Sequence, residues 1–393
     1  MKAEELARRI AFTLGALVIY RVGKYIPLPG INPDVLPGVV RSISILSLDI
    51  VPYVTAAVIV QLFTLMFGLR KLLDARGERG SRTIERYTLA LTALFVIGQS
   101  LAIASGLEEF PNFVSEPGWL FRISTVMTLV GGTLFLIWLS RQITLRGVGN
   151  GLALILFVGI VTEVPASVGV ALEFGRRGVH ESNLMLGLLF LIVVVVVLIV
   201  VMESARRHVP IELAARRNAT QSIEPRMSDL SLKLNNAGII PVMVGALLLD
   251  LPLRLGAVIG GQGTWLRPIA EQFGSGRPAY MIYLAVAIVV LALIYTAFIL
   301  DPGEIATKLK RFGGSIPGVE AGDATAEHID SILSRTAIYG AVYLAFICLV
   351  PEMLSAYAQL AGVPFFHFGG VPALIVVSTV LDIDRQIRVA ALT

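Results

Sequence analysis

The strongest constraint on the fold of this chain is that its apolar residues come in long, nearly uninterrupted blocks. A helix needs about 20 such residues to cross a hydrocarbon core of about 30 Å. Only 15% of the 393 residues are charged, whereas a soluble domain carries about 25%. The sequence therefore predicts an all-α polytopic membrane protein with ten transmembrane helices. The ten blocks lie near 10–28, 50–69, 87–106, 121–140, 152–172, 184–202, 238–256, 279–300, 336–356 and 368–383.

Basic residues predict the orientation of these spans, because cytoplasmic loops of membrane proteins are enriched in lysine and arginine. With the N-terminus inside, 23 of the 32 lysines and arginines fall on one side. We therefore expect both termini in the cytoplasm, as an even number of spans requires. We also expect the first block to stay as a span and not to be cleaved as a signal peptide. No A-x-A-like site follows it, and Arg21 and Lys24 interrupt it.

Two long basic loops, 203–233 and 301–335, lie on the predicted cytoplasmic side. Long loops in compact proteins tend to be functional or disordered. Their basic side chains suit either lipid headgroups or a soluble docking partner, and periodicity alone leaves both interpretations open.

Few residues suggest catalytic, metal or ion-coupling chemistry. The four histidines are scattered without a second ligand at helical spacing, and a lone cysteine, Cys348, cannot form an intrachain bridge. The glycine-rich stretch 147–151 has no preceding strand, so we interpret it as a tight turn and not as a dinucleotide site. Arg21 and Lys24 stand near the outer end of the first span, where long side chains can reach the interface. Glu163 is the one carboxylate near the middle of a block. We expect no enzyme and no cofactor.

Two apolar pairs stand at the starts of the second and fifth blocks: Ile50 with Val54, and Leu152 with Leu156. A spacing of four places each pair on one helical face. Ordinary packing explains such pairs, and so does a narrow apolar constriction that gates a pore.

The order of several motifs resembles the SecY family, the channel subunit of the Sec protein translocase. Any single motif is weak, but eight in the same order cover essentially the whole chain. They are Y-I-P-L-P-G-I at 25–31, I-V-P-Y at 50–53 with Q-L at 61–62, G-E-R-G-S-R at 77–82, R-G-V-G-N-G at 146–151, K-L-N-N-A-G-I-I-P at 233–241, Y-T-A-F at 295–298 with Glu304, I-C-L-V-P-E at 347–352 and F-G-G at 368–370.

The resemblance implies ten transmembrane helices in two inverted five-helix halves, 1–172 and 173–393, around a central pore. Spans two, three, seven and eight would form a lateral gate, with Gln61 and Asn235 as its polar residues. A hydrogen bond between those two would favour closure by about 1 kcal/mol. The pore ring carries over to Ile50, Val54, Leu152, Leu156, Met243 and Ile375.

The same resemblance implies a protein-conducting channel of the cell inner membrane that passes unfolded preproteins across, or membrane proteins sideways into, the bilayer. Its expected partners are SecE-type and SecG-type small subunits, the SecA motor, the ribosome, preprotein and signal-peptide clients, and membrane lipid. The two basic loops become docking sites for SecA or the ribosome. The residues expected at the docking sites are Arg207, Arg216, Arg217, Lys308, Lys310, Arg311 and Glu320.

Four features depart from the family pattern. The stretch 32–49 is short for a plug helix, and Glu320 replaces an arginine tied to SecA-driven activity. Leu213 stands where a tyrosine is usual, and the sequence reaches Thr393 without the customary basic tail. A SecY-like accessory translocase or insertase scaffold without an open pore is therefore an alternative, and a small-molecule facilitator is a further one.

Overall fold

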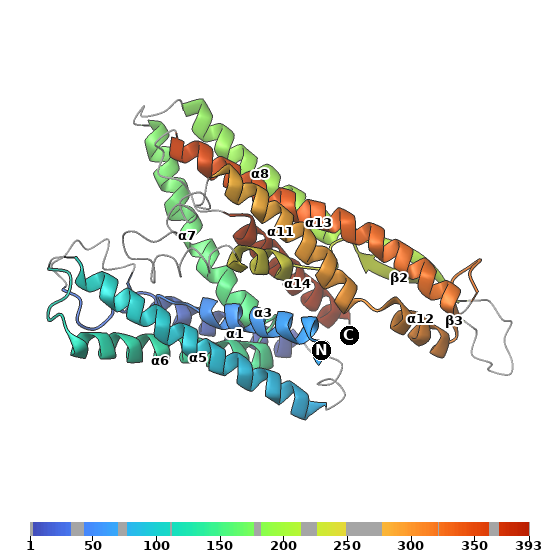
Figure 1. Ribbon diagram of the computed structural model, residues 1–393, viewed down its shortest axis with the longest axis horizontal. Helices are drawn as coiled ribbons and strands as arrows, with labels where there is room; N and C mark the ends of the chain where they lie inside the picture. Colours follow the sequence, from blue (N-terminus) through green and yellow to red (C-terminus); the bar gives the residue numbers. More distant parts are fainter. Residues whose placement is uncertain are drawn as a thin grey trace. The chain divides into compact units, whose positions relative to one another are not determined.

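A computed structural model describes most of the chain as two compact units (Figure 1). The first unit comprises Met1–Glu163 with Thr379–Thr393, and the second comprises Val164–Ser378. The described residues are 3–32, 43–69, 77–110, 112–176, 182–213, 226–248, 277–320, 322–360 and 369–392.

The first unit is a helical bundle in which α5 packs against both α6 and α3, and α1 packs against α6. Long apolar runs form helices here because a helix satisfies every backbone group within its own segment. The helices of this unit are α1 (Ala3–Gly23), α3 (Val51–Met66), α5 (Glu78–Glu108), α6 (Trp119–Arg146), the first part of α7 (Gly151–Arg176) and the last part of α14 (Gly370–Leu392).

In the second unit, α11 lies along α13, and the short helix α12 also packs on α13. Residues 240–248 are helical as well, and the described part of the seventh predicted block ends there. The named helices are α8 (Ser182–Ser204), α11 (Pro278–Ile299), α12 (Pro302–Arg311), α13 (Asp323–Leu360) and the first part of α14.

The predicted spans agree with these helices. Each of the ten blocks overlaps helical residues, and the first helix begins earlier than expected, at Ala3. Within the described residues, five helices are long and apolar enough to cross a membrane, and two shorter ones are also apolar. The five are Arg79–Glu108, Trp119–Arg146, Gly151–Gly169, Pro278–Arg311 and Asp323–Leu354, and the shorter ones are Val51–Met66 and Phe190–Ser204.

A small antiparallel sheet joins the two basic loops, which the sequence analysis left without secondary structure. β1 (Arg206–Leu213) pairs along its whole length with β2 (Arg226–Lys233), and its last residues pair with β3 (Gly314–Ser315). The strand order is β2-β1-β3. The loop containing β1 and the loop containing β3 are therefore parts of one structure.

The sheet has a hydrophobic core of its own. Val209 and Ile211 alternate with exposed residues along β1 and are buried, as expected for a strand with one covered face. Val209 and Leu232 pack in one cluster with Ile329 and Leu333 of α13. This packing fixes the sheet to the first turns of α13.

Candidate functional site

The predicted pore-ring residues of the second span lie at the start of α3. Ile50 is the residue before the first helical position and is fully buried, and Val54 is 6% exposed. Pro52 explains why the helix begins here, since proline is favoured in the first turn, where its missing N–H costs nothing.

Leu152 and Leu156 lie on the first two turns of α7 and are half-buried. The start of this helix is set by Asn150, whose side-chain oxygen accepts a hydrogen bond from the Leu152 N–H at 3.0 Å. This is the usual capping role of asparagine, which satisfies a donor left free at a helix start. Leu152 therefore occupies a fixed position in the helix.

The glycine-rich stretch before α7 is the tight turn that the sequence predicts. The Val148 N–H donates to the Thr13 hydroxyl at 3.0 Å, and the Gly149 N–H donates to the Gln386 side-chain oxygen at 2.9 Å. Gly149 has a φ of +86°, which favours glycine. The turn thus ties α7 to α1 and to the end of α14 within the first unit.

Met243 and Ile375 belong to the second unit. Met243 lies in the helical residues 240–248 and is half-buried, and Ile375 is buried on α14. All six predicted ring residues are thus helical or next to a helix start, four in the first unit and two in the second.

A cluster of polar side chains, absent from our sequence predictions, directly precedes Ile50. One carboxylate oxygen of Asp49 accepts from the Tyr20 hydroxyl at 2.7 Å and lies 3.1 Å from the Lys24 ammonium. The other oxygen accepts from the Ile50 N–H at 2.8 Å. We call Tyr20, Lys24 and Asp49 the Asp49 cluster.

Lys24 and Arg21 therefore do more than reach toward the interface. Arg21 donates to the Thr162 hydroxyl of α7 at 3.2 Å and to the Tyr25 hydroxyl at 3.0 Å. The sequence signal for the Asp49 cluster was Asp49 itself, just before the second predicted span, together with Arg21 and Lys24 at the end of the first.

The predicted gate residues lie in different units. Gln61 is half-buried on α3, seven residues after Val54 and so on the same helical face. Asn235 is 4% exposed in the second unit. Its amide nitrogen donates to Glu203 at 2.7 Å, and its oxygen accepts from the Gly238 N–H at 3.0 Å.

Glu203 is a partner that the sequence analysis did not identify. It stands near the end of α8, and the Leu234 N–H donates to the carbonyl of Ala205 at 3.1 Å. The open end of the β1–β2 hairpin, where Arg206 faces Lys233, follows directly. Glu203 and Asn235 thus connect the hairpin to the start of the seventh span.

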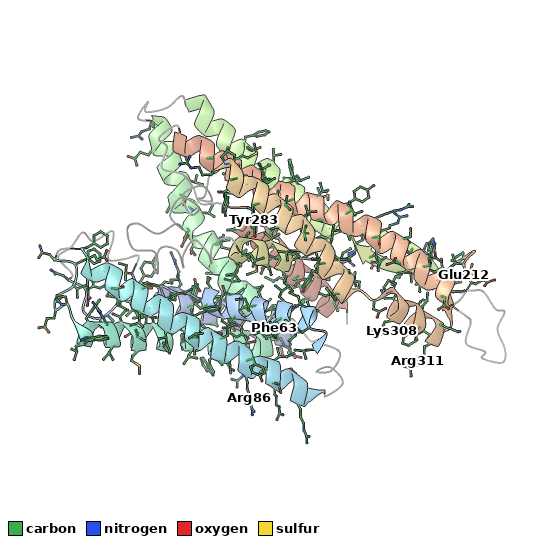
Figure 2. All side chains as sticks on the ribbon, in the orientation of Figure 1. Phe63, Arg86, Glu212, Tyr283, Lys308 and Arg311 are labelled. Atoms are coloured by element: carbon green, nitrogen blue, oxygen red, sulfur yellow. The ribbon has the colours of Figure 1, made fainter. Side chains whose placement is uncertain are left out.

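An apolar groove of about 820 Å³ lies between α3 and α5 in the first unit. Phe63, labelled in Figure 2, lines it from α3, and Tyr87 and Leu94 line it from α5. Gln61 is not among its lining residues. The groove and the Gln61 face are thus separate surfaces of α3.

The predicted docking residues that the structure describes are all exposed. Arg207 lies on β1, and Lys308, Lys310 and Arg311 lie on α12; Figure 2 labels Lys308 and Arg311 there. Arg216 and Arg217 are outside the described residues. Arg207 thus lies on β1 and the other three cations lie on α12, and these two elements are connected through β3 and α13.

Favourable interactions stabilise both ends of α12. The Asp301 carboxylate accepts from the N–H groups of Gly303 and Glu304 at 3.0 and 3.3 Å. Its last turn carries the three cations, which favourably oppose the partial negative charge of a helix C-terminus. The arrangement makes a rigid, solvent-exposed cationic surface.

Glu320, the departure from the family pattern, is exposed between β3 and α13. Its carbonyl accepts from the buried Thr325 hydroxyl at 2.7 Å, so its backbone is fixed to the first turn of α13. An acidic side chain thus lies in the same loop as the predicted docking cations of α12. Among the described residues, no group of three or more metal-binding side chains forms.

Comparison with known proteins gives a consistent result. A family model described as SecY matches residues 44–383. The protein translocase subunit SecY of Escherichia coli strain K12 is 34% identical over 409 residues, which cover 98% of this chain and 91% of that protein.

Solved structures show the same fold. One, reported for the plug domain of SecY that stabilises the closed channel, has a TM-score of 0.71 at 18% identity and covers 98% of this chain and 92% of that one. Sec61 in a canine ribosome–channel complex has a TM-score of 0.67 at 17% identity, with the same shares covered.

Proposed function

This chain belongs to the SecY family, and from that premise we propose that it is the protein-conducting channel subunit of a translocase in the cell inner membrane. It passes unfolded preproteins across the membrane and membrane proteins sideways into it. It is a multi-pass membrane channel and not an enzyme. The observation that carries the proposal is the 34% identity to a translocase subunit over nearly the whole chain.

We propose that the six apolar ring residues form the seal of the pore. Apolar side chains can close a pore by dewetting or by steric contact, and the unbranched thioether of Met243 adapts to varied neighbours. A channel for arbitrary polypeptides needs such an adaptable constriction more than it needs a binding site. The residues are Ile50, Val54, Leu152, Leu156, Met243 and Ile375.

We further propose that the channel consists of two halves, 1–172 and 173–393, with Gln61 and Asn235 on the lateral gate between them. The contacts of Asn235 with Glu203 and Gly238 support a fixed position for its side chain. The stretch 32–49 serves as a short plug, of which residues 33–42 are outside the described part.

The basic surface of β1 and α12 is proposed to dock the ribosome or SecA on the cytoplasmic side, where both termini also lie. Exposed arginines and lysines suit RNA phosphates and acidic protein surfaces, and such contacts weaken with salt. The fold shared with Sec61 in a ribosome–channel complex supports the ribosome as a partner. SecE-type and SecG-type subunits and membrane lipid complete the expected assembly.

The test is co-purification from native membranes, followed by a translocation assay in proteoliposomes with and without SecA. We expect capture of a small single-span subunit and transport of a preprotein that requires SecA or translation. Capture of no subunit, together with no transport under either condition, would refute the proposal.

An accessory role in translocation or insertion, without an open pore, is the second candidate. The observation in its favour is Glu320, an exposed negative charge in the same loop as Lys308, Lys310 and Arg311. It predicts partner capture without transport. Restoration of SecA-driven transport by Glu320→Arg would instead favour a channel with a modified motor contact.

A further inference from the structure

We propose that Asp49 is a positioning residue that keeps the first-unit part of the pore ring assembled in the resting channel. The geometry points to this role because the Asp49 cluster links α1 to the start of α3 and lies against Gly159 of α7, and both α3 and α7 carry predicted ring residues. The inference rests on the proposed function, since it assigns the residue that maintains the proposed seal.

The first contact fixes Ile50. The Asp49 carboxylate accepts from the N–H of Ile50 and is held in turn by the Tyr20 hydroxyl and the Lys24 ammonium. Tyr20 lies on α1 and is 1% exposed, so the anchor is part of the core. The first ring residue is thus tied to α1 through one carboxylate.

The second contact reaches α7. Gly159 lies where an added methyl group would approach the Tyr20 hydroxyl to 3.0 Å and the Asp49 carboxylate to 3.4 Å. Gly159 follows Leu156 by three residues and Leu152 by seven, so all three share one helical face. The face of α7 that carries two ring leucines therefore continues directly onto the Asp49 cluster.

The segment that leads into Asp49 is also fixed. The Leu28 N–H donates to the Ile43 carbonyl at 3.2 Å, and the Ile45 N–H donates to the Ile26 carbonyl at 3.0 Å. Leu46 is 2% exposed. Residues 43–45 are therefore hydrogen-bonded to residues 26–28, directly after α1.

The Asp49 cluster costs folding free energy, and this cost favours a specific role for it. The side chains of Lys24 and Asp49 are only 23% and 16% exposed, so both charges lose much of their contact with water. Asp49 also has a φ of +54°, a region that side chains other than glycine seldom occupy. Packing alone would be achieved more simply with apolar residues.

These contacts predict what happens when the charge pair is broken. A charge left without its partner in a mostly buried site destabilises the closed arrangement. Ile50 and the α7 leucines would then separate more easily, and the resting channel would leak. Clients with weak signal sequences would also pass more easily, because less energy would be needed to open the ring.

The experiment compares Asp49→Asn, Lys24→Met and the double variant in the purified translocase, reconstituted in planar bilayers. We expect each single variant to raise resting ion conductance by about tenfold. Breaking a buried charge pair is enough to shift the equilibrium between closed and open channel by that factor. The double variant should return toward the wild-type value, since both members of the Lys24–Asp49 pair are removed together. Tyr20→Phe, which keeps the charge pair, should have a smaller effect.

The matched control is Asp384→Asn, which removes an exposed carboxylate that pairs with Arg388 four residues later. It should leave conductance unchanged, and a single monodisperse peak in size-exclusion chromatography for every variant separates leak from misfolding. Single and double variants that conduct as the wild type does would overturn the inference. Wild-type protein that translocates nothing would instead refute the proposed function.

Discussion

Individual glycines, more than the apolar side chains, determine how the ring leucines are presented. A methyl group on Gly151 would overlap the carbonyl of Ser140, and one on Gly147 would overlap the Thr13 hydroxyl. These close approaches let α6 reverse directly into α7. The positions of Leu152 and Leu156 therefore depend on residues outside the predicted ring.

Gly151→Ala should destabilise the protein. We expect a loss of about 1–3 kcal/mol, because the added methyl group forces backbone atoms apart in a packed site. Thermal unfolding in detergent measures the effect. Gly169→Ala is the control on the same helix, since an added methyl group there meets nothing within 4 Å, and an equal loss in both variants would contradict this explanation.

Leu156→Asn should raise the resting conductance of the channel, because a polar side chain hydrates an apolar constriction and weakens its seal. Val161→Asn is the control, since Val161 lies on the same helix but away from the face shared by Leu152 and Leu156. Single-channel recording in planar bilayers measures both variants. Equal conductance in the two would remove Leu156 from the proposed ring.

Among the secondary-structure elements, the short helix α12 combines a stable start with a cationic end. Asp301 caps its first turn, Ile305 and Leu309 pack against the core of the sheet, and the cations of the last turn are exposed. Because β3 follows directly and pairs with β1, the helix is oriented by the sheet as well as by α13.

The double variant Lys310→Gln, Arg311→Gln should weaken ribosome binding and lower its salt dependence. For duplex nucleic acid, each phosphate contact contributes about 0.9 to the steepness of log K, the binding constant, against log salt concentration. Loss of two cations should therefore lower this steepness by about 1–2. Binding titrations over a range of salt concentrations measure the slope. The control Arg385→Gln, Arg388→Gln removes two exposed cations from the end of α14, and an unchanged slope in the first variant would exclude α12 from the contact.

For the whole molecule, the sequence predicted the helices well and the contacts between distant residues poorly. The apolar blocks and the turn at 147–151 follow from local composition, and the structure has them. The alternating apolar residues Val209 and Ile211, and Leu230 and Leu232, were a local signal for the β1–β2 hairpin that was overlooked. In the sheet, β3 could not be predicted because it has only two residues and pairs with a strand far away in the sequence. The Asp49 cluster was missed for a related reason: Tyr20 and Asp49 are 29 positions apart, and neither is unusual alone.

The predicted orientation of the chain can be tested with single cysteines. Glu320→Cys should be labelled by an impermeant thiol reagent only from the cytoplasmic side, and Glu116→Cys only from the opposite side, because both positions are exposed. The native Cys348 is buried and serves as an internal blank. Labelling of Glu320→Cys from the outside would invert the proposed topology.

The order of strands in the small sheet has a consequence for biogenesis. Leu213 pairs with Gly314, and α11 lies between them in the sequence. During synthesis β1 and β2 can form a hairpin early, but β3 joins only after the ribosome has completed α11 and α12. A partly synthesised chain therefore carries the β1–β2 hairpin without its third strand, and the proposed docking surface is complete only once α12 and β3 have been made.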